Sequence, residues 1–117
     1  MRSRLSLIAL SLIAAISLPS LAIAATPAQI AAGQKIAETT TLGNCDACHN
    51  FQGASEAGNI GPALHHVKSM MPNRKVFYAI IYNEEARNPQ TVMPAFGKNH
   101  ILTPQQINDV IDFMYTK

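Results

Sequence analysis

The chain has 117 residues and a formal net charge of +2, with nine Lys and Arg against seven Asp and Glu. That length suits one small domain and excludes a large multidomain enzyme. There is no Trp, and three Tyr and four Phe are few for a domain this small, so we expect a bound group to fill part of the core.

The first 24 residues have the pattern of a secretory signal peptide that is cleaved on export. Two arginines precede an apolar run over residues 5–16, Pro19 breaks the run, and Ala22-Ile23-Ala24 is a small-residue cleavage site. An uncleaved membrane anchor is the alternative, and the serines in the run together with Pro19 argue against it. We therefore expect a periplasmic product without a membrane anchor.

The expected product, residues 25–117, is electrically neutral. The two arginines of the leader account for the whole excess of positive charge, which leaves seven basic and seven acidic side chains. The charge pattern therefore gives no support for binding to nucleic acid.

The first helix is predicted directly after the leader. Thr26-Pro27-Ala28-Gln29 is a capping box with Pro at the first helical position, and Ile30, Gly33 and Ala37 then share one face. A glycine on that face costs helix stability, so we expect another helix to cross closely at Gly33.

Two further helices are predicted in the second half of the chain. The middle one runs from about residue 73 to residue 83, with Asn73 as its cap. Its apolar stripe is Val76, Phe77, Ile80 and Ile81. The last one starts with a second capping box, Thr103-Pro104-Gln105-Gln106. Its apolar stripe is Ile107, Val110, Ile111 and Met114.

Long segments rich in polar residues, Gly and Pro separate these helices, over residues 42–65 and 84–103. Loops of this length in a small domain are usually functional or wrapped around a bound group. No segment alternates convincingly as a strand. The sequence thus predicts an all-α domain of three to four helices whose long loops fold around a ligand.

The central motif is Cys45-Asp46-Ala47-Cys48-His49, which is the C-x-x-C-H signature of covalent haem attachment. Two thiols separated by two residues can each form a thioether with a vinyl group of the same porphyrin. The adjacent histidine then lies under the iron. We therefore expect one haem c and its iron, attached to Cys45 and Cys48, with His49 as the proximal ligand.

Three alternatives for the cysteine pair compete with haem attachment. They are a structural disulfide, a thioredoxin-like redox pair and a zinc site. A redox pair favours a βαβ context, which is missing here. A zinc site would need further ligands, and the spacing of the other histidines matches no common zinc pattern. Those histidines are His65, His66 and His100.

The second axial ligand decides whether such an iron mainly transfers electrons. The candidates are Met70, Met71, Met93, Met114, His65, His66 and His100. Met114 falls on an apolar helical stripe and is assigned to the core. Met93 lies in residues 88–97, which have no helical period and carry prolines on both sides of the methionine. We predict Met93 as the ligand, because a stiff loop can present its sulfur to the haem face opposite His49; Met/His ligation raises the haem potential.

A bend at Gly61-Pro62 follows the haem motif closely. It can aim a backbone carbonyl at the free ring nitrogen of His49, and such a hydrogen bond at Pro62 would fix the ring. An ordinary turn is the alternative interpretation.

Taken together, the motifs resemble the SoxX family, the small mono-haem subunits of the SoxAX cytochromes of bacterial sulfur oxidation. The resemblance runs from about residue 32 to residue 117. Ala95 departs from the family pattern, in which a second proline is expected. The matching segments are Gly43-Asn44-Cys45, Cys48-His49, Gly58-Asn59-Ile60-Gly61-Pro62, Asn88-Pro89, Thr91-Val92-Met93-Pro94, Phe96-Gly97 and Ile101-Leu102-Thr103.

The resemblance implies a class I cytochrome c-like fold in which the first and last helices cross, with His49 and Met93 as axial ligands. It also implies a heterodimer with a SoxA-like haem subunit. That complex would act as an L-cysteine S-thiosulfotransferase, which links thiosulfate oxidatively to a cysteine of a SoxYZ-type carrier protein. The electrons would pass to a downstream acceptor cytochrome.

Both cysteines of this chain are consumed by haem attachment, so no thiolate remains to hold a sulfur intermediate. We therefore expect an electron-transfer subunit with no catalytic residue of its own. The alternative is a free-standing, diffusible periplasmic cytochrome c. An apolar patch of Met70, Met71, Phe77 and Tyr78 is either part of an interface or, by default, of the core.

Overall fold

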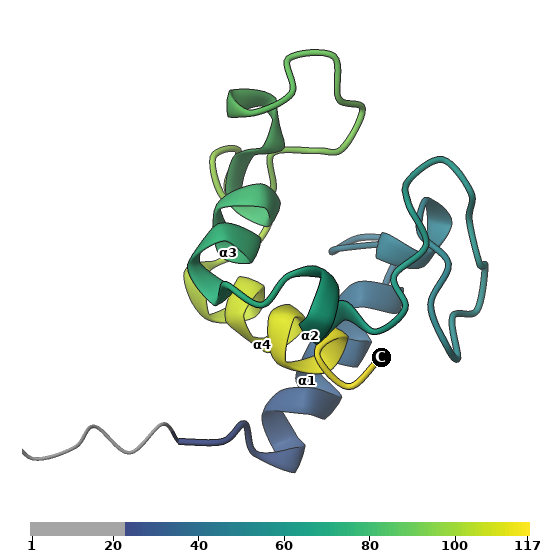
Figure 1. The fold of residues 1–117 in the computed structure, drawn as a ribbon, viewed down its shortest axis with the longest axis vertical. Helices are drawn as coiled ribbons and strands as arrows, with labels where there is room; N and C mark the ends of the chain where they lie inside the picture. The colour runs from purple at the N-terminus through teal and green to yellow at the C-terminus, as the bar shows by residue number, and fades with distance from the viewer. Residues whose placement is uncertain (1–22) are drawn as a thin grey trace, which may run out of the picture.

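The structure is a computed structural model. The part of the chain that it describes contains four α-helices and two 3-10 turns, joined by loops (Figure 1). That part is residues 23–117, so the predicted signal peptide falls almost wholly outside it. The helices are α1 (Pro27–Glu38), α2 (Val67–Met70), α3 (Arg74–Asn83) and α4 (Pro104–Met114). The 3-10 turns are Cys45–Ala47 and Glu84–Ala86. Residues 23–117 contain no strand, and the predicted all-α fold is confirmed.

Both predicted capping boxes are present at the starts of α1 and α4. The Thr26 hydroxyl accepts a hydrogen bond from the Gln29 amide at 3.3 Å, and the Gln29 side chain accepts one from the Thr26 amide at 2.9 Å. Thr103 and Gln106 repeat this exchange at 3.2 and 2.8 Å. The reciprocal bonds satisfy amide groups that have no partner within the helix, so each helix starts at a defined residue.

α3 starts at its predicted cap, because the Asn73 side-chain oxygen accepts hydrogen bonds from two backbone amides of the first turn. Phe77, Ile80 and Ile81 are buried, as predicted. Val76 is 42% exposed, so its place on the predicted stripe is wrong. The buried side of α3 is narrow, and a residue one step before Phe77 is rotated about 100° away from it.

The crossing of α1 and α4 occurs at Gly33 and forms the centre of the core. A Cβ placed on Gly33 would collide with the carbonyl oxygen of Asp109 and lie 2.8 Å from the Cβ of Phe113. The ring of Phe113 also packs edge-to-face on Phe51, with 5.8 Å between the ring centroids. The backbones can approach this closely only because residue 33 lacks a side chain, as the sequence predicted.

The C-terminus fastens α2 to the rest of the domain. The amide of Val67 donates to the carbonyl of Lys117 at 3.1 Å, and the Tyr115 hydroxyl donates to the carbonyl of Met71 at 2.8 Å. These contacts hold a helix of only four residues, which the sequence did not signal. No helix within residues 23–117 is long and apolar enough to cross a membrane.

We predict that Gly33→Ala lowers the free energy of unfolding by about 1–3 kcal/mol, because the new methyl group overpacks the crossing. Helix propensity alone would make the alanine variant more stable by about 1 kcal/mol. A loss of stability would therefore be due to the helix crossing. Denaturant unfolding of the haem-loaded protein measures it, with Gln34→Ala on the exposed side of α1 as the control. A change within about 0.5 kcal/mol would mean that the crossing tolerates a side chain.

Candidate functional site

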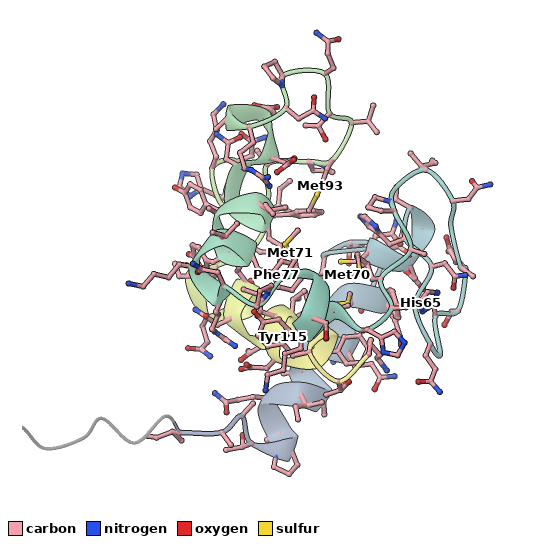
Figure 2. All side chains as sticks on the ribbon, in the orientation of Figure 1. His65, Met70, Met71, Phe77, Met93 and Tyr115 are labelled. Atoms are coloured by element: carbon pink, nitrogen blue, oxygen red, sulfur yellow. The ribbon has the colours of Figure 1, made fainter. Side chains whose placement is uncertain are left out.

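A cavity of about 820 Å³ lies between α3, α4 and the two long loops. Its lining is mostly apolar and includes Ile80, Phe96 and Leu102. In Figure 2, Met93 and Met71 reach into the region between α3 and the long loop that follows α1, and Phe77 lies below them. A cavity of this size is in the range that encloses a cofactor.

The C-x-x-C-H segment reaches the cavity as a single 3-10 turn. The amides of Cys48 and His49 both donate to the carbonyl of Cys45, at 3.2 and 2.8 Å. This places Cys45, Cys48 and His49 together in the cavity lining. Burial raises the pKa of the Cys45 thiol to about 12. A thiol-disulfide redox pair needs a thiolate near neutral pH, so this environment argues against that alternative.

The ring of His49 is oriented by the bend at Gly61-Pro62. Its Nδ1 lies 2.8 Å from the carbonyl oxygen of Pro62, which leaves Nε2 free when Nδ1 donates the proton. A Cβ on Gly61 would lie 2.6 Å from Nδ1 and 2.9 Å from Nε2 of the ring. The bend is held on the motif by the Gly61 amide, which donates to the Cys48 carbonyl at 2.8 Å.

Met93 enters the cavity lining from the opposite loop. It is half-buried, and its amide donates to the Thr91 hydroxyl at 3.1 Å. Farther along the loop, Ala95 and Phe96 are buried and hold this stretch against the protein. The cavity thus brings together two thiols, an imidazole and a thioether from chain segments more than 40 residues apart.

The other predicted ligand candidates fall into two groups. Met70, Met71 and Met114 also line the cavity, and Met114 is buried in the core as predicted. The three remaining histidines are exposed and lie outside the cavity lining. Within residues 23–117, no group of three or more His, Cys, Asp or Glu is arranged so that it could hold a metal ion.

Several residues of the site had no role predicted for them from the sequence. Ile60 and Val92 line the cavity yet are 67% and 78% exposed, so they form part of its rim. Glu84 and Arg87 also line it and pair with each other at 3.4 Å. Alternating or helical periodicity cannot identify such positions, because they lie in loops and in a 3-10 turn.

Three comparisons with known proteins each give a match. The family model for cytochrome c matches residues 30–116. A crystal structure of SoxXA from P. pantotrophus superimposes with a TM-score of 0.62 at 27% sequence identity, over 81% of this chain and 83% of that chain. An "uncharacterized lipoprotein" of Aquifex aeolicus (strain VF5) is 36% identical over 74 residues, which are 62% of this chain and 36% of the relative. This chain therefore spans little more than a third of that relative's length. The structural match confirms the resemblance to SoxX.

The family match and the structural match imply a covalent haem c with its iron, and the residues of the cavity fit this group. Paired thiols suit the two vinyl groups of one porphyrin, and an imidazole and a thioether are the iron ligands of cytochromes c. The apolar lining suits the porphyrin faces. The expected cofactor is therefore confirmed.

We predict that Gly61→Ala destabilises the haem-loaded protein by about 1–3 kcal/mol, because the added methyl group must displace the His49 ring or the bend. Thermal unfolding measures the change. Asn59→Ala, at an exposed position of the same segment, is the matched control. Equal stabilities of the two variants would show that the ring does not depend on the close approach of residue 61.

Proposed function

This chain belongs to the cytochrome c family, and from that premise we propose that it is the electron-transfer subunit of a SoxAX-like complex. The complex links thiosulfate oxidatively to a cysteine of a SoxYZ-type carrier protein. The observation that carries the proposal is that the C-x-x-C-H turn and the Met93 loop line one cavity in a fold that superimposes on SoxXA. The leader pattern supports export to the periplasm.

The residues of the cavity have separate roles in this proposal. Cys45 and Cys48 attach the haem covalently, and His49 and Met93 ligate its iron. When bound, haem c supplies one-electron oxidation and reduction. The Pro62 carbonyl accepts a hydrogen bond from Nδ1 of His49, which fixes the ring and leaves Nε2 as the ligand atom. The apolar lining keeps water away from the ligands.

The sulfur chemistry must take place on a partner, because both cysteines of the chain are used for attachment. A carrier thiol R–SH and thiosulfate become R–S–S–SO₃⁻ with the release of one proton and two electrons. A chain with one haem accepts electrons one at a time. The reaction therefore needs either a second redox centre or two sequential transfers through this haem, and a SoxA-like haem subunit would supply the second centre, with a downstream cytochrome as the final acceptor.

The rim of the cavity supports contact with a protein partner. Ile60, Met70 and Val92 come from three different segments of the chain and are 67%, 47% and 78% exposed. Among residues 23–117, the charged side chains of the lining are Glu84 and Arg87, which pair with each other. Exposed apolar side chains with little net charge suit a lasting protein–protein contact better than the charged docking face of a diffusible carrier.

The apolar patch named in the sequence analysis, residues 70, 71, 77 and 78, lies partly in the core and partly at the surface. Phe77 is buried in the core, where its ring lies 5.8 Å from that of Tyr115. Met71 and Tyr78 are partly buried and pack against the core. Met70, at 47% exposed, is the most exposed residue of this patch.

We predict that Met93→Ala abolishes the weak sulfur-to-iron charge-transfer band of the oxidised protein, because the thioether ligand is lost. The midpoint potential should fall by on the order of 0.1 V, a fraction of the roughly 0.8 V range that axial ligands cover. Visible spectroscopy and redox titration measure both changes. Met70→Leu and Met71→Leu are the controls, since both residues also line the cavity. Loss of the band in a control variant but not in Met93→Ala would assign the ligand to that other methionine.

We predict that the purified chain shows reversible redox chemistry without sulfur transfer, whereas the chain reconstituted with its haem-bearing partner shows both. Thiosulfate, a carrier thiol and an oxidised acceptor cytochrome form the assay. Val92→Asp should weaken the partner complex about tenfold, because a charge enters an apolar contact. Asn99→Asp adds the same charge at an exposed position outside the cavity lining and should have little effect. Sulfur transfer by the chain alone, or full activity of the partner without it, would contradict the proposal.

A further inference from the structure

The loop that carries Met93 is attached at both of its ends to the last turn of α3 and the 3-10 turn that follows. At its start, the amide of Asn88 donates to the carbonyl of Glu84 at 2.9 Å. At its end, the amides of Gly97 and Lys98 both donate to the carbonyl of Tyr82 at 3.1 Å. Between these points, residues 88–94 are mostly exposed. The position of the loop therefore depends on its few attachments rather than on a buried face.

The loop rejoins α3 at Gly97 and Lys98, which we call its return point. The side chain of Tyr82 packs against this point. A Cβ on Gly97 would collide with this ring, coming within 2.6 Å of its Cε2 and 2.7 Å of its Cγ. The ring is stacked on Tyr78, with 6.0 Å between the centroids and 18° between the planes. Within residues 23–117 the Tyr82 hydroxyl forms no hydrogen bond with another residue. The contact thus depends on the aromatic ring and on a residue 97 without a side chain.

We propose that Tyr82 is a positioning residue, whose ring on Gly97 holds the Met93 loop in the place where its sulfur can ligate the iron. This inference rests on the proposed role of Met93. Gly97 is only four residues from Met93, so a shift at Gly97 is transmitted to the sulfur over a short length of chain. Residues 95–97 are buried, whereas Val92 beside the ligand is 78% exposed, so the anchored end and the ligand end of the loop are distinct.

The proposal has a consequence for ligand exchange at the iron. An added ligand such as imidazole must first displace Met93. Its apparent dissociation constant is then the intrinsic constant divided by the fraction of molecules in which the sulfur has left the iron. Loosening the return point raises that fraction, so imidazole binds more tightly in apparent terms although it makes no new contact.

The test is a spectrophotometric titration of the oxidised, haem-loaded protein with imidazole. Tyr82→Ala should lower the apparent dissociation constant about tenfold, and Tyr82→Phe, which keeps the ring, should stay within about twofold of the parent. Gly97→Ala keeps Tyr82 but forces the ring and the loop apart, and it should act in the same direction as Tyr82→Ala. If Tyr82→Ala fails to fold, Gly97→Ala still tests whether the ring contact holds the Met93 loop.

Lys98→Gln is the matched control at the same return point. Lys98 pairs with Glu85 at 3.0 Å, and both side chains are about half exposed, so the loss of this pair should leave imidazole binding within about twofold of the parent. If Lys98→Gln tightens imidazole binding as much as Tyr82→Ala does, any disturbance of the segment is sufficient and the specific role of the ring is overturned.

A double-variant cycle separates the proposal from the assignment of the ligand. In a Met93→Ala background the sulfur is already absent, so adding Tyr82→Ala should not tighten imidazole binding further. An equal tightening in that background would mean that Tyr82 controls entry to the cavity, and the proposal would be overturned. If Met93→Ala alone leaves imidazole affinity unchanged, the proposed ligand is wrong, and that result is distinct from an unchanged affinity in Tyr82→Ala alone.

Discussion

The close crossing of α1 and α4 determines where every other part of this small domain can lie. Gly33 rests directly against the backbone of Asp109, and the Phe113 side chain lies beside the same contact. The C-x-x-C-H turn follows α1 within seven residues, so the crossing fixes the position of the attachment site. The end of α4 contributes Met114 to the cavity, so the same contact also fixes part of its lining.

The two sides of the cavity are built differently, and the difference fits their roles. On the His49 side, the backbone of the motif and the Gly61-Pro62 bend are joined by short hydrogen bonds, and the ring is oriented by the Pro62 carbonyl. On the Met93 side, an exposed loop is attached to α3 at its two ends. If His49 and Met93 ligate the iron as proposed, a firmly held imidazole and a thioether on a separately anchored loop would allow contacts outside the cavity to control ligand strength.

The division of labour proposed for the complex follows from simple counts. Two cysteines are both required for one haem, so the chain offers an electron acceptor but no thiolate for the substrate sulfur. Some of its exposed apolar side chains line the cavity, where a partner's redox centre would need to approach; these are Ile60, Met70, Val92 and Ile101. In the proposed complex, the electron path and the docking surface would therefore be the same region of the molecule.

The sequence by itself determined the features that arise from bonds between residues close together in the chain. Capping boxes at Thr26 and Thr103 join residues three apart, and the cysteine spacing of the haem motif is equally local. Gly33 was also identified, because a glycine on an apolar helical face weakens the helix unless a second backbone packs against it. These features involve residues within about one helical turn of one another, so the sequence predicts them without knowledge of the fold.

Only the tertiary structure decided which of several equivalent residues meet. It exposed Val76, formed α2 against the C-terminus, and placed several methionines around one cavity. The contact of Tyr82 with Gly97 joins residues 15 positions apart and has no periodic pattern. Such contacts depend on how helices cross and where loops return. Those arrangements are selected by packing of the whole core, and no local stretch of sequence contains them.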